Sequence, residues 1–203
     1  MAKNTTDFDV VKKAHCKNDV QTEEQMLQLM QCVDDPLYFM RKFMKVQHPL
    51  KGLMDFKPYP YQVRIIEAFH SHRFTCLLSG RQLGKTTCAA GYLLWRALFI
   101  PDSTILIAAN KFAQALEVMN KIRFGYEGLP DFIRAGVIEY NKSNVTFDNG
   151  SRLVARATST DSGRGLAVSL LYCLDGETTV KIRDKKTGEI QEVSLAHLYD
   201  ILV

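Results

Sequence analysis

Long uncharged apolar runs are absent from this sequence. No stretch approaches the ~18 apolar residues that a membrane-spanning helix needs, and charged residues recur through the first 20 positions, which excludes the apolar core of a signal peptide. Cysteine-pair motifs are also absent, because none of the five cysteines forms a C-x-x-C pair. Their odd number favours reduced thiols over a disulfide framework. These absences predict a soluble intracellular protein.

Strong charge of either sign is lacking as well. The net charge of +4 and the pI near 8.7 permit a nucleic-acid partner without requiring one. The apolar share of 46% is sufficient for a core, and 203 residues suit one domain with a small appendage. The charge is uneven: residues 173–203 hold four Lys or Arg against six Asp or Glu, whereas the preceding residues hold 22 against 16. The composition therefore changes near residue 173.

Helical patterns fill the first third of the chain. Residues 1–22 are polar and are expected to be flexible. Helical spacing of apolar residues predicts helices over 23–32, from Asp35-Pro36 onward and over 61–70. The stretch 48–60 is dense in Pro and Gly and is expected to be a loop.

Strand and helix patterns then alternate. Asp148-Asn149-Gly150-Ser151 is a strong hairpin signal between two short apolar strands. Such an alternation predicts an α/β fold with a mostly parallel sheet that helices cover on both faces. The expected strands are 74–78, 104–109, 145–147, 153–155 and 167–172, and the expected intervening helices are 86–99 and 111–124.

The loop between the first of these strands and its helix has the composition of a phosphate-binding loop. Backbone N–H groups at a helix N-terminus suit anionic phosphates, and Gly84 permits a close approach of the backbone. Lys85 would reach the β- and γ-phosphates and Thr86 would offer its hydroxyl to Mg²⁺. Ser79 stands where the usual pattern has its first Gly. The candidate nucleotide contacts are Ser79, Gly80, Gln82, Gly84, Lys85, Thr86 and Thr87.

A second candidate contact precedes this loop by about 20 residues. Tyr61 and Gln62 open the helix over 61–70. An amide can pair with the adenine edge and an aromatic ring can stack on the base. We therefore expect these two residues to recognise the adenine of ATP.

The segment from Gly80 to Thr87 resembles the Walker A motif of the large terminase subunits of tailed phages. The likeness covers roughly residues 24–172. Further segments agree in the family's order: Asp35-Pro36-Leu37-Tyr38-Phe39, His48-Pro49, Leu129-Pro130-Asp131-Phe132, Asp148-Asn149-Gly150-Ser151 and Arg164-Gly165.

The resemblance implies a phosphate-loop ATPase that uses ATP and Mg²⁺ to move double-stranded DNA into a capsid. The implied partners are the capsid portal, the small terminase subunit and further copies in a ring, in the cytoplasm of an infected host cell. Arg81 would be a candidate arginine finger. Arg164 would sense the γ-phosphate or a neighbouring subunit.

The same resemblance leads us to expect a Walker B pair, Asp-Glu, directly after the strand that ends at Tyr172. Cys173 and Leu174 follow instead, and Gly176 separates Asp175 from Glu177. One interpretation keeps Asp175 as the Walker B acid and Glu177 as the base, in a truncated helicase-like ATPase. Its weakness is the spacing, since the two carboxylates should be adjacent.

The other interpretation is that a foreign segment begins at Cys173. Cys-Leu-x-Gly-x-Thr-x-Val resembles the first block of inteins, and the charged stretch 181–190 predicts a hairpin. The resemblance implies that Cys173 is a splicing nucleophile and that Tyr172 is the splice junction. Only 31 residues follow Tyr172, so we expect the N-terminal piece of a split intein, whose partner carries the remaining intein and terminase sequence.

These interpretations divide the chain into three parts. Residues 1–22 form a flexible N-terminus. Residues 23–172 form an incomplete terminase ATPase domain with its N-terminal helices and phosphate-loop sheet. Residues 173–203 form a short β-rich intein segment.

Overall fold

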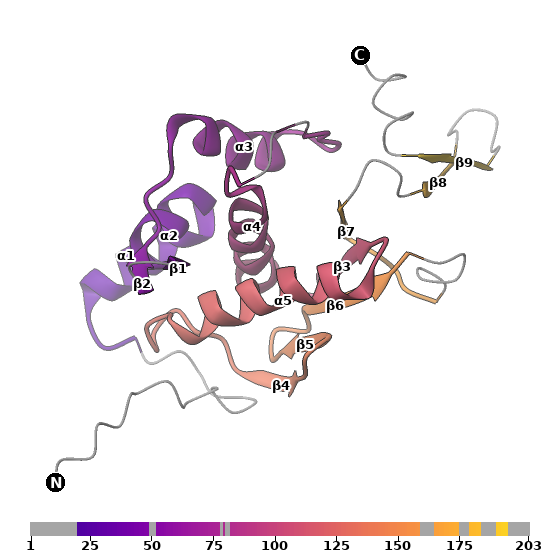
Figure 1. Cartoon of the computed structure of the whole chain (residues 1–203). Helices are drawn as coiled ribbons and strands as arrows, with labels where there is room; N and C mark the ends of the chain where they lie inside the picture. Colours follow the sequence, from indigo (N-terminus) through magenta and orange to yellow (C-terminus); the bar gives the residue numbers. More distant parts are fainter. Residues whose placement is uncertain are drawn as a thin grey trace, which may run out of the picture.

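The computed structural model describes residues 20–48, 52–77, 79, 82–158, 165–174, 179–183 and 190–194. The helices are α1 (Glu23–Asp34), α2 (Pro36–Phe43), α3 (Pro60–Ser71), α4 (Lys85–Phe99) and α5 (Phe112–Glu127). The strands are β1 (Lys45–His48), β2 (Gly52–Asp55), β3 (Thr104–Ala109), β4 (Val137–Tyr140), β5 (Asn144–Phe147), β6 (Arg152–Ala157), β7 (Leu170–Leu174), β8 (Thr179–Arg183) and β9 (Ile190–Ser194). Figure 1 shows how they are arranged.

The first two helices begin at side-chain caps. The Thr22 hydroxyl accepts a hydrogen bond from the Gln25 amide at 3.2 Å, and the Asp35 carboxylate accepts one from the Leu37 amide. Capping oxygens of this kind satisfy amides that have no partner within the helix. Helix α2 buries an apolar stripe that includes Phe39 and Phe43 in the core. The apolar stripe of α1 is largely exposed, at Met26, Leu27, Met30 and Val33.

A small hairpin replaces the long loop expected over 48–60. Strands β1 and β2 pair antiparallel, with Lys45 opposite Asp55. These two side chains also form an ion pair. The loop prediction was wrong for Gly52–Asp55 because cross-strand pairing, which a Pro and Gly count does not capture, decides the conformation there.

The main sheet has five strands in the order β4-β5-β6-β3-β7. Strand β3 pairs parallel with both β6 and β7, whereas β5 pairs antiparallel with β4 and β6. The hairpin signal at Asp148–Ser151 is confirmed by the β5–β6 pair. The expectation of a mostly parallel sheet was wrong in this half, because a short turn can join only antiparallel neighbours. Strand β4 was not expected. The sheet is therefore mixed.

The strand expected over 74–78 is not formed at the described residues 74–77. Phe74 is 65% exposed and Leu77 is 39% exposed, so this part is not buried either. A strand exists only where a neighbour accepts its hydrogen bonds. Among the strands that the structure describes, none pairs with this segment. Apolar composition alone was therefore a misleading indicator here.

Helix α4 is the centre of the core. Nearly all of its residues from Cys88 to Leu98 are buried, and Trp95 Nε1 donates a 2.6 Å hydrogen bond to the Cys32 carbonyl. Helices α2, α3 and α5 contact α4, and α5 also contacts β3 and β6. Helix α3 lies beside α4 (Figure 1), with its first turn bonded to Leu83 and with His70 near its end against Trp95. The helices thus hold the first turn of α4 in a defined place.

Strands β8 and β9 form a separate two-stranded antiparallel sheet. The hairpin expected around 181–190 is confirmed in its two strands. The intein resemblance also implies a short helix over 194–199; Ser194 instead ends β9, and the remaining residues of that segment lie outside the described ranges. No helix in the described ranges is long and apolar enough to cross a membrane.

Candidate nucleotide site

The candidate phosphate loop (residues 79–86) lies, at its described residues, near the carboxyl ends of the parallel strands. Only four residues, Ile100 to Ser103, connect α4 to β3. The helix and the strand therefore run in opposite directions, and the start of α4 lies near the end of β3. Cys88, near the start of α4, is close enough to Tyr172 of β7 to contribute to the raised pKa of its hydroxyl, which agrees with this placement. Ligands of open α/β sheets bind at this edge.

The backbone of the loop turns through two left-handed residues. Gln82 has φ 62° and Gly84 has φ 73°. Gly84 is also the residue that precedes α4, and its carbonyl accepts hydrogen bonds from the amides of Thr87 and Cys88 at 3.0 Å each. The remaining amides of the first turn have no carbonyl within the helix to bond. They form an N-terminus suited to an anion.

Lys85 is held within its own loop. Its Nζ donates a 2.7 Å hydrogen bond to the Ser79 carbonyl. The side chain is partly buried, so its charge stands in a region of restricted solvent. A phosphate oxygen would be a stronger partner for an ammonium than a neutral carbonyl is. The geometry therefore allows Lys85 to exchange Ser79 for an anion.

Tyr61 and Gln62 both contact the phosphate loop. The Tyr61 hydroxyl donates to the Leu83 carbonyl at 3.0 Å, and Gln62 Nε2 donates to the same oxygen at 3.1 Å. Gln62 Oε1 accepts from the Tyr59 amide at 3.0 Å, and the residue is only 7% exposed. The sequence predicted these two residues near the candidate loop, and the structure brings both of them into contact with Leu83.

Tyr59 lies beside this contact and was not among the residues expected there from the sequence. Its ring stacks on that of Tyr61, with centroids 5.8 Å apart and planes at 5°. It is 64% exposed, so the outer face of the pair is open to solvent. The sequence contains a sign of this ring pair. In Tyr-Pro-Tyr, one tyrosine comes before the first residue of the helix and the other comes after it.

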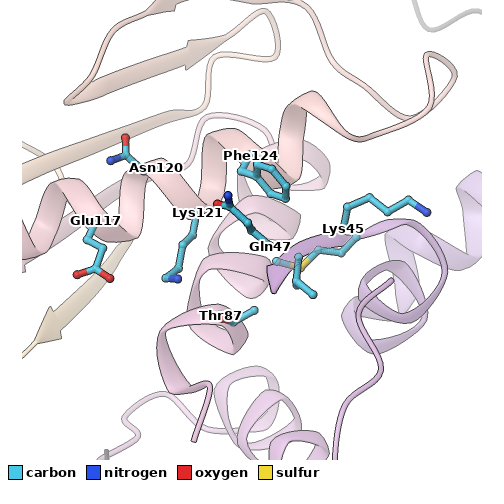
Figure 2. A pocket seen from close by; sticks show the side chains of 9 residues that line it. Lys45, Gln47, Thr87, Glu117, Asn120, Lys121 and Phe124 are labelled. Atoms are coloured by element: carbon cyan, nitrogen blue, oxygen red, sulfur yellow. The ribbon is translucent and has the colours of Figure 1, made fainter. Parts of the chain in front are cut away.

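A cavity of 330 Å³ lies on the opposite side of α4, between β1 and α5. Thr87 lines it, together with Gln47, Lys121 and Phe124. Figure 2 shows Lys121 extending toward the turn that carries Thr87, while the Lys45 ammonium points away. Thr87 therefore faces this cavity.

The expected splice junction lies inside a continuous strand. Strand β7 begins at Leu170, later than predicted, and runs through Tyr172 and Cys173 to Leu174. Burial raises the pKa of the Cys173 thiol to about 11. Burial, with smaller effects from Cys88 and Cys173, raises the pKa of Tyr172 to about 12. Both side chains are therefore neutral at pH 7.

The carboxyl edge of the sheet carries one more polar group. Thr158 directly follows β6, and its Oγ1 is buried without a hydrogen-bond partner among the described residues. Among these residues no cluster of three His, Cys, Asp or Glu could hold a metal ion. Several expected site residues lie outside the described ranges, namely Gly80, Arg81, Arg164, Asp175 and Glu177.

A comparison with known protein families identifies a relationship for the middle of the chain. Residues 76–175, just under half of the chain, match the model of the family described as terminase large subunit, T4likevirus-type, N-terminal. The match contains the phosphate loop, α4, α5 and the whole main sheet. Large terminase subunits are ATPases of viral DNA packaging. Over this segment the chain is thus similar to the N-terminal part of a T4-type large terminase subunit, which indicates an ATP hydrolase of DNA packaging.

Proposed function

We propose that this chain binds ATP with Mg²⁺ at the loop before α4 and provides the N-terminal part of a viral DNA-packaging motor. The observation that carries the proposal is the phosphate loop itself. It lies within the matched segment, starts a buried helix at Lys85 and approaches the carboxyl edge of the sheet. A helix N-terminus with a lysine and a left-handed glycine is a site for a triphosphate.

Each residue of the loop has a distinct role in this proposal. Lys85 exchanges the Ser79 carbonyl for the β- and γ-phosphates, and Gly84 lets the first amides of α4 approach the anion. Thr86 is half-buried in the first turn of α4, where its hydroxyl suits Mg²⁺ held jointly with the phosphates. When bound, Mg²⁺ would neutralise part of the negative charge of the phosphates. Arg81 is proposed to stabilise the charge of the transferred phosphoryl group, and Arg164 to sense the γ-phosphate.

A motor of this kind implies particular partners. We propose double-stranded DNA, a capsid portal, a small terminase subunit and further copies in a ring. ATPase activity of the complete motor in the presence of DNA tests the proposal. Lys85→Ala should abolish that activity, and Arg81→Ala should lower turnover far more than nucleotide affinity, since a finger acts mainly in the transition state. Full turnover by Lys85→Ala would overturn the proposal.

We further propose that the motor chain is made by protein splicing in trans. What supports this is the Cys-Leu-x-Gly-x-Thr-x-Val pattern from Cys173, followed by the antiparallel β8–β9 hairpin. The Cys173 sulfur attacks the Tyr172 carbonyl, the Tyr172–Cys173 amide breaks, and the Cys173 nitrogen takes the proton, which leaves a thioester. A nucleophile of the partner accepts the acyl group, and cyclisation of the partner's last intein Asn releases the insert. An acyl shift to nitrogen then restores an amide after Tyr172.

A second function is favoured by one observation. Strand β7 continues without a break through Cys173 and Leu174, and the family match ends at Asp175, directly after that strand. This is the place of a Walker B acid beside a phosphate loop. The chain would then be a helicase-like or packaging ATPase without an intein, in which Asp175 orients Mg²⁺ through water.

Two substitutions separate the proposals. Mixed with its partner fragment, the wild-type chain should lose residues 173–203 and form a ligated product in mass spectrometry, and Cys173→Ala should form none. The chain alone should show no steady ATP turnover. ATPase activity of the chain alone that disappears in Asp175→Asn and persists in Cys173→Ala would establish the second function and exclude splicing.

A further inference from the structure

Strand β7 has the composition of an inner strand but forms an edge of the main sheet. It pairs with β3 on one side, and within the described residues no strand pairs with its other side. Its sequence, Leu-Leu-Tyr-Cys-Leu, carries no charge. Apolar runs of this kind are typical of the inner strands of parallel sheets, whereas edge strands usually carry charges or irregularities that block further pairing. The backbone groups on the open side of β7 are therefore available to another strand.

The segment 74–77, which leads into the phosphate loop, also lacks a neighbouring strand. Its sequence, Phe-Thr-Cys-Leu, favours a strand, but none of the described strands pairs with it. Phe74 and Leu77 are exposed. The Thr75 hydroxyl donates a 3.1 Å hydrogen bond to the Ala68 carbonyl of α3. In the described part of the chain, two apolar segments that suit a sheet are thus without a strand neighbour.

The connection through α4 determines where a strand at 74–77 could join the sheet. The segment precedes α4, and β3 follows α4, so the three would form a strand–helix–strand unit with parallel strands. Both sides of β3 are already occupied, by β6 and β7. The start of α4 lies near β7, where Cys88 contributes to the raised pKa of Tyr172. The place for a strand at 74–77 is therefore beyond β7.

We propose that β7 accepts a parallel apolar strand from the partner fragment of the proposed splicing, and that 74–77 pairs with the far side of this strand. A strand in that position provides a neighbour for both open segments at once. A second copy of this chain, paired edge to edge at β7, would leave 74–77 without one. The sequence joined after Tyr172 starts at the carboxyl end of β7, and a crossover of about a dozen residues brings it back alongside β7. The two fragments thus recognise each other through the ATPase sheet before any bond is exchanged.

The added strand also supports the nucleotide site. Ser79, whose carbonyl accepts the hydrogen bond from Lys85, lies two residues after the segment 74–77. Pairing of 74–77 therefore fixes the start of the phosphate loop. The partner fragment and Mg²⁺-ATP should each strengthen the binding of the other by the same factor. This inference rests on the proposed splicing and on the proposed nucleotide site.

Amide hydrogen exchange tests the inference without any splicing chemistry. Cys173→Ala blocks ligation, so the full chain and its partner fragment can be studied as a stable mixture. In the chain alone, at a concentration too low for self-association, the amides of 74–77 and those of β7 that do not bond to β3 should exchange rapidly. Addition of the partner fragment should slow both sets together, on the order of 100-fold, and should leave the core of α5 unchanged.

Substitutions in 74–77 separate sheet pairing from contacts made by the intein segment. Neighbouring amides of a strand point to opposite sides, so one of Thr75→Pro and Cys76→Pro removes a donor to the inserted strand. That variant should bind the partner fragment about 10-fold more weakly, because one backbone group in the sheet loses its partner. Thr75→Ala and Cys76→Ala keep both amides and are the matched controls, which should bind as the parent chain does. Since the segment is exposed, neither proline should disturb the fold of the chain alone.

The outcomes separate this inference from the proposed splicing. Protection of β7 and 74–77 in the mixture, without ligation by the wild-type chain, would support the inserted strand and exclude splicing. Ligation without protection of these segments, or with equal binding by the proline and alanine variants, would overturn the inserted strand and leave splicing intact. Protection of both segments already in the chain alone would also overturn it, because they would then pair with each other. Neither protection nor ligation would overturn both.

Discussion

At the scale of single residues, the glycine that precedes α4 combines two constraints. Gly84 has φ 73°, and a Cβ there would meet Gln62 Nε2 at 2.5 Å. Gly52 has φ 69°, and among the described residues other than its chain neighbours none has an atom within 4 Å of the same position. The two glycines thus share a backbone conformation and differ in their surroundings.

A comparison of alanine substitutions at the two glycines measures how much the contact between Gly84 and Gln62 contributes to stability. Gly52→Ala should cost about 1 kcal/mol of unfolding free energy, the penalty of a left-handed alanine. Gly84→Ala should cost more and should also weaken triphosphate binding, because the methyl group displaces Gln62. Chemical denaturation and calorimetry measure both effects. Equal stability losses with unchanged binding would show that the contact is unimportant.

Cys173 offers a test that depends on pH. Because burial raises the pKa of its thiol to about 11, the neutral form prevails at pH 7 and the reactive thiolate increases tenfold for each pH unit up to that value. Alkylation by iodoacetamide, followed by mass spectrometry, should therefore rise steeply from pH 7 to pH 10. In urea at pH 8 the same thiol should react on the order of 100-fold faster, since an unfolded cysteine has a pKa near 8.5.

The result bears on splicing. A rate for Cys173 in the folded chain that equals its rate in urea would mean that the thiol is already accessible and activated. Slow alkylation would mean that the partner fragment must first release Cys173 from β7. Exposed Cys76 serves as the internal control for reagent quality.

At the scale of elements, the turn after β5 is also the C-terminal clamp of α4. Asn149 Nδ2 donates to the carbonyls of Ala97 and Leu98 at 2.9 and 3.0 Å, and Ser151 Oγ donates to that of Ile100 at 2.7 Å. Carbonyls in the last turn of a helix have no partner inside it. The turn Asp148–Ser151, which the sequence predicted as a hairpin turn, therefore also fixes the C-terminal end of α4.

Removal of this clamp should lower stability without touching the phosphate loop. Asn149→Ala should reduce the free energy of unfolding by about 2–3 kcal/mol, because it removes three modest hydrogen bonds, the two to α4 and the one that Asn149 Oδ1 accepts from the Ser151 amide. Asn141→Ala is the matched control, since Asn141 is exposed and its side chain donates a hydrogen bond to the exposed Glu139. Thermal unfolding measures the difference. A loss in Asn141→Ala as large as that in Asn149→Ala would contradict the assignment.

Prediction from sequence succeeded where the signal was local. Thr104–Ala109 was placed at its true bounds, and α4 within one residue, because a buried apolar run and a helix that follows a glycine loop are visible in the sequence. It failed at Phe74–Leu77, where composition indicated a strand but pairing is decided by distant residues. For the same reason, the sequence predicted only that Gln62 lies near the loop and did not predict its hydrogen bonds. The sequence indicated a residue near the loop, but only the structure shows which atoms it bonds.

At the scale of the whole molecule, the two edges of the main sheet differ. Strand β4 forms one edge, has four residues and carries a register irregularity between Val137 and Glu139. Short and irregular edge strands resist pairing with other chains. Strand β7 forms the other edge, has five apolar residues without charge and pairs regularly with β3. Within the described residues, nothing pairs with its outer side.

The unprotected edge predicts concentration-dependent self-association of the isolated chain. Leu171 is 47% exposed on β7, so Leu171→Lys places a charge on this edge without disturbing the core, and it should shift association to higher concentration. Ile138 is 57% exposed on β4, and Ile138→Lys should have little effect because the irregular edge is already protected. Sedimentation velocity over a concentration series measures both variants. Association that responds equally to the two substitutions would point to general surface hydrophobicity, whereas a response to Leu171→Lys alone would locate the contact at β7, the strand that carries Tyr172 and Cys173.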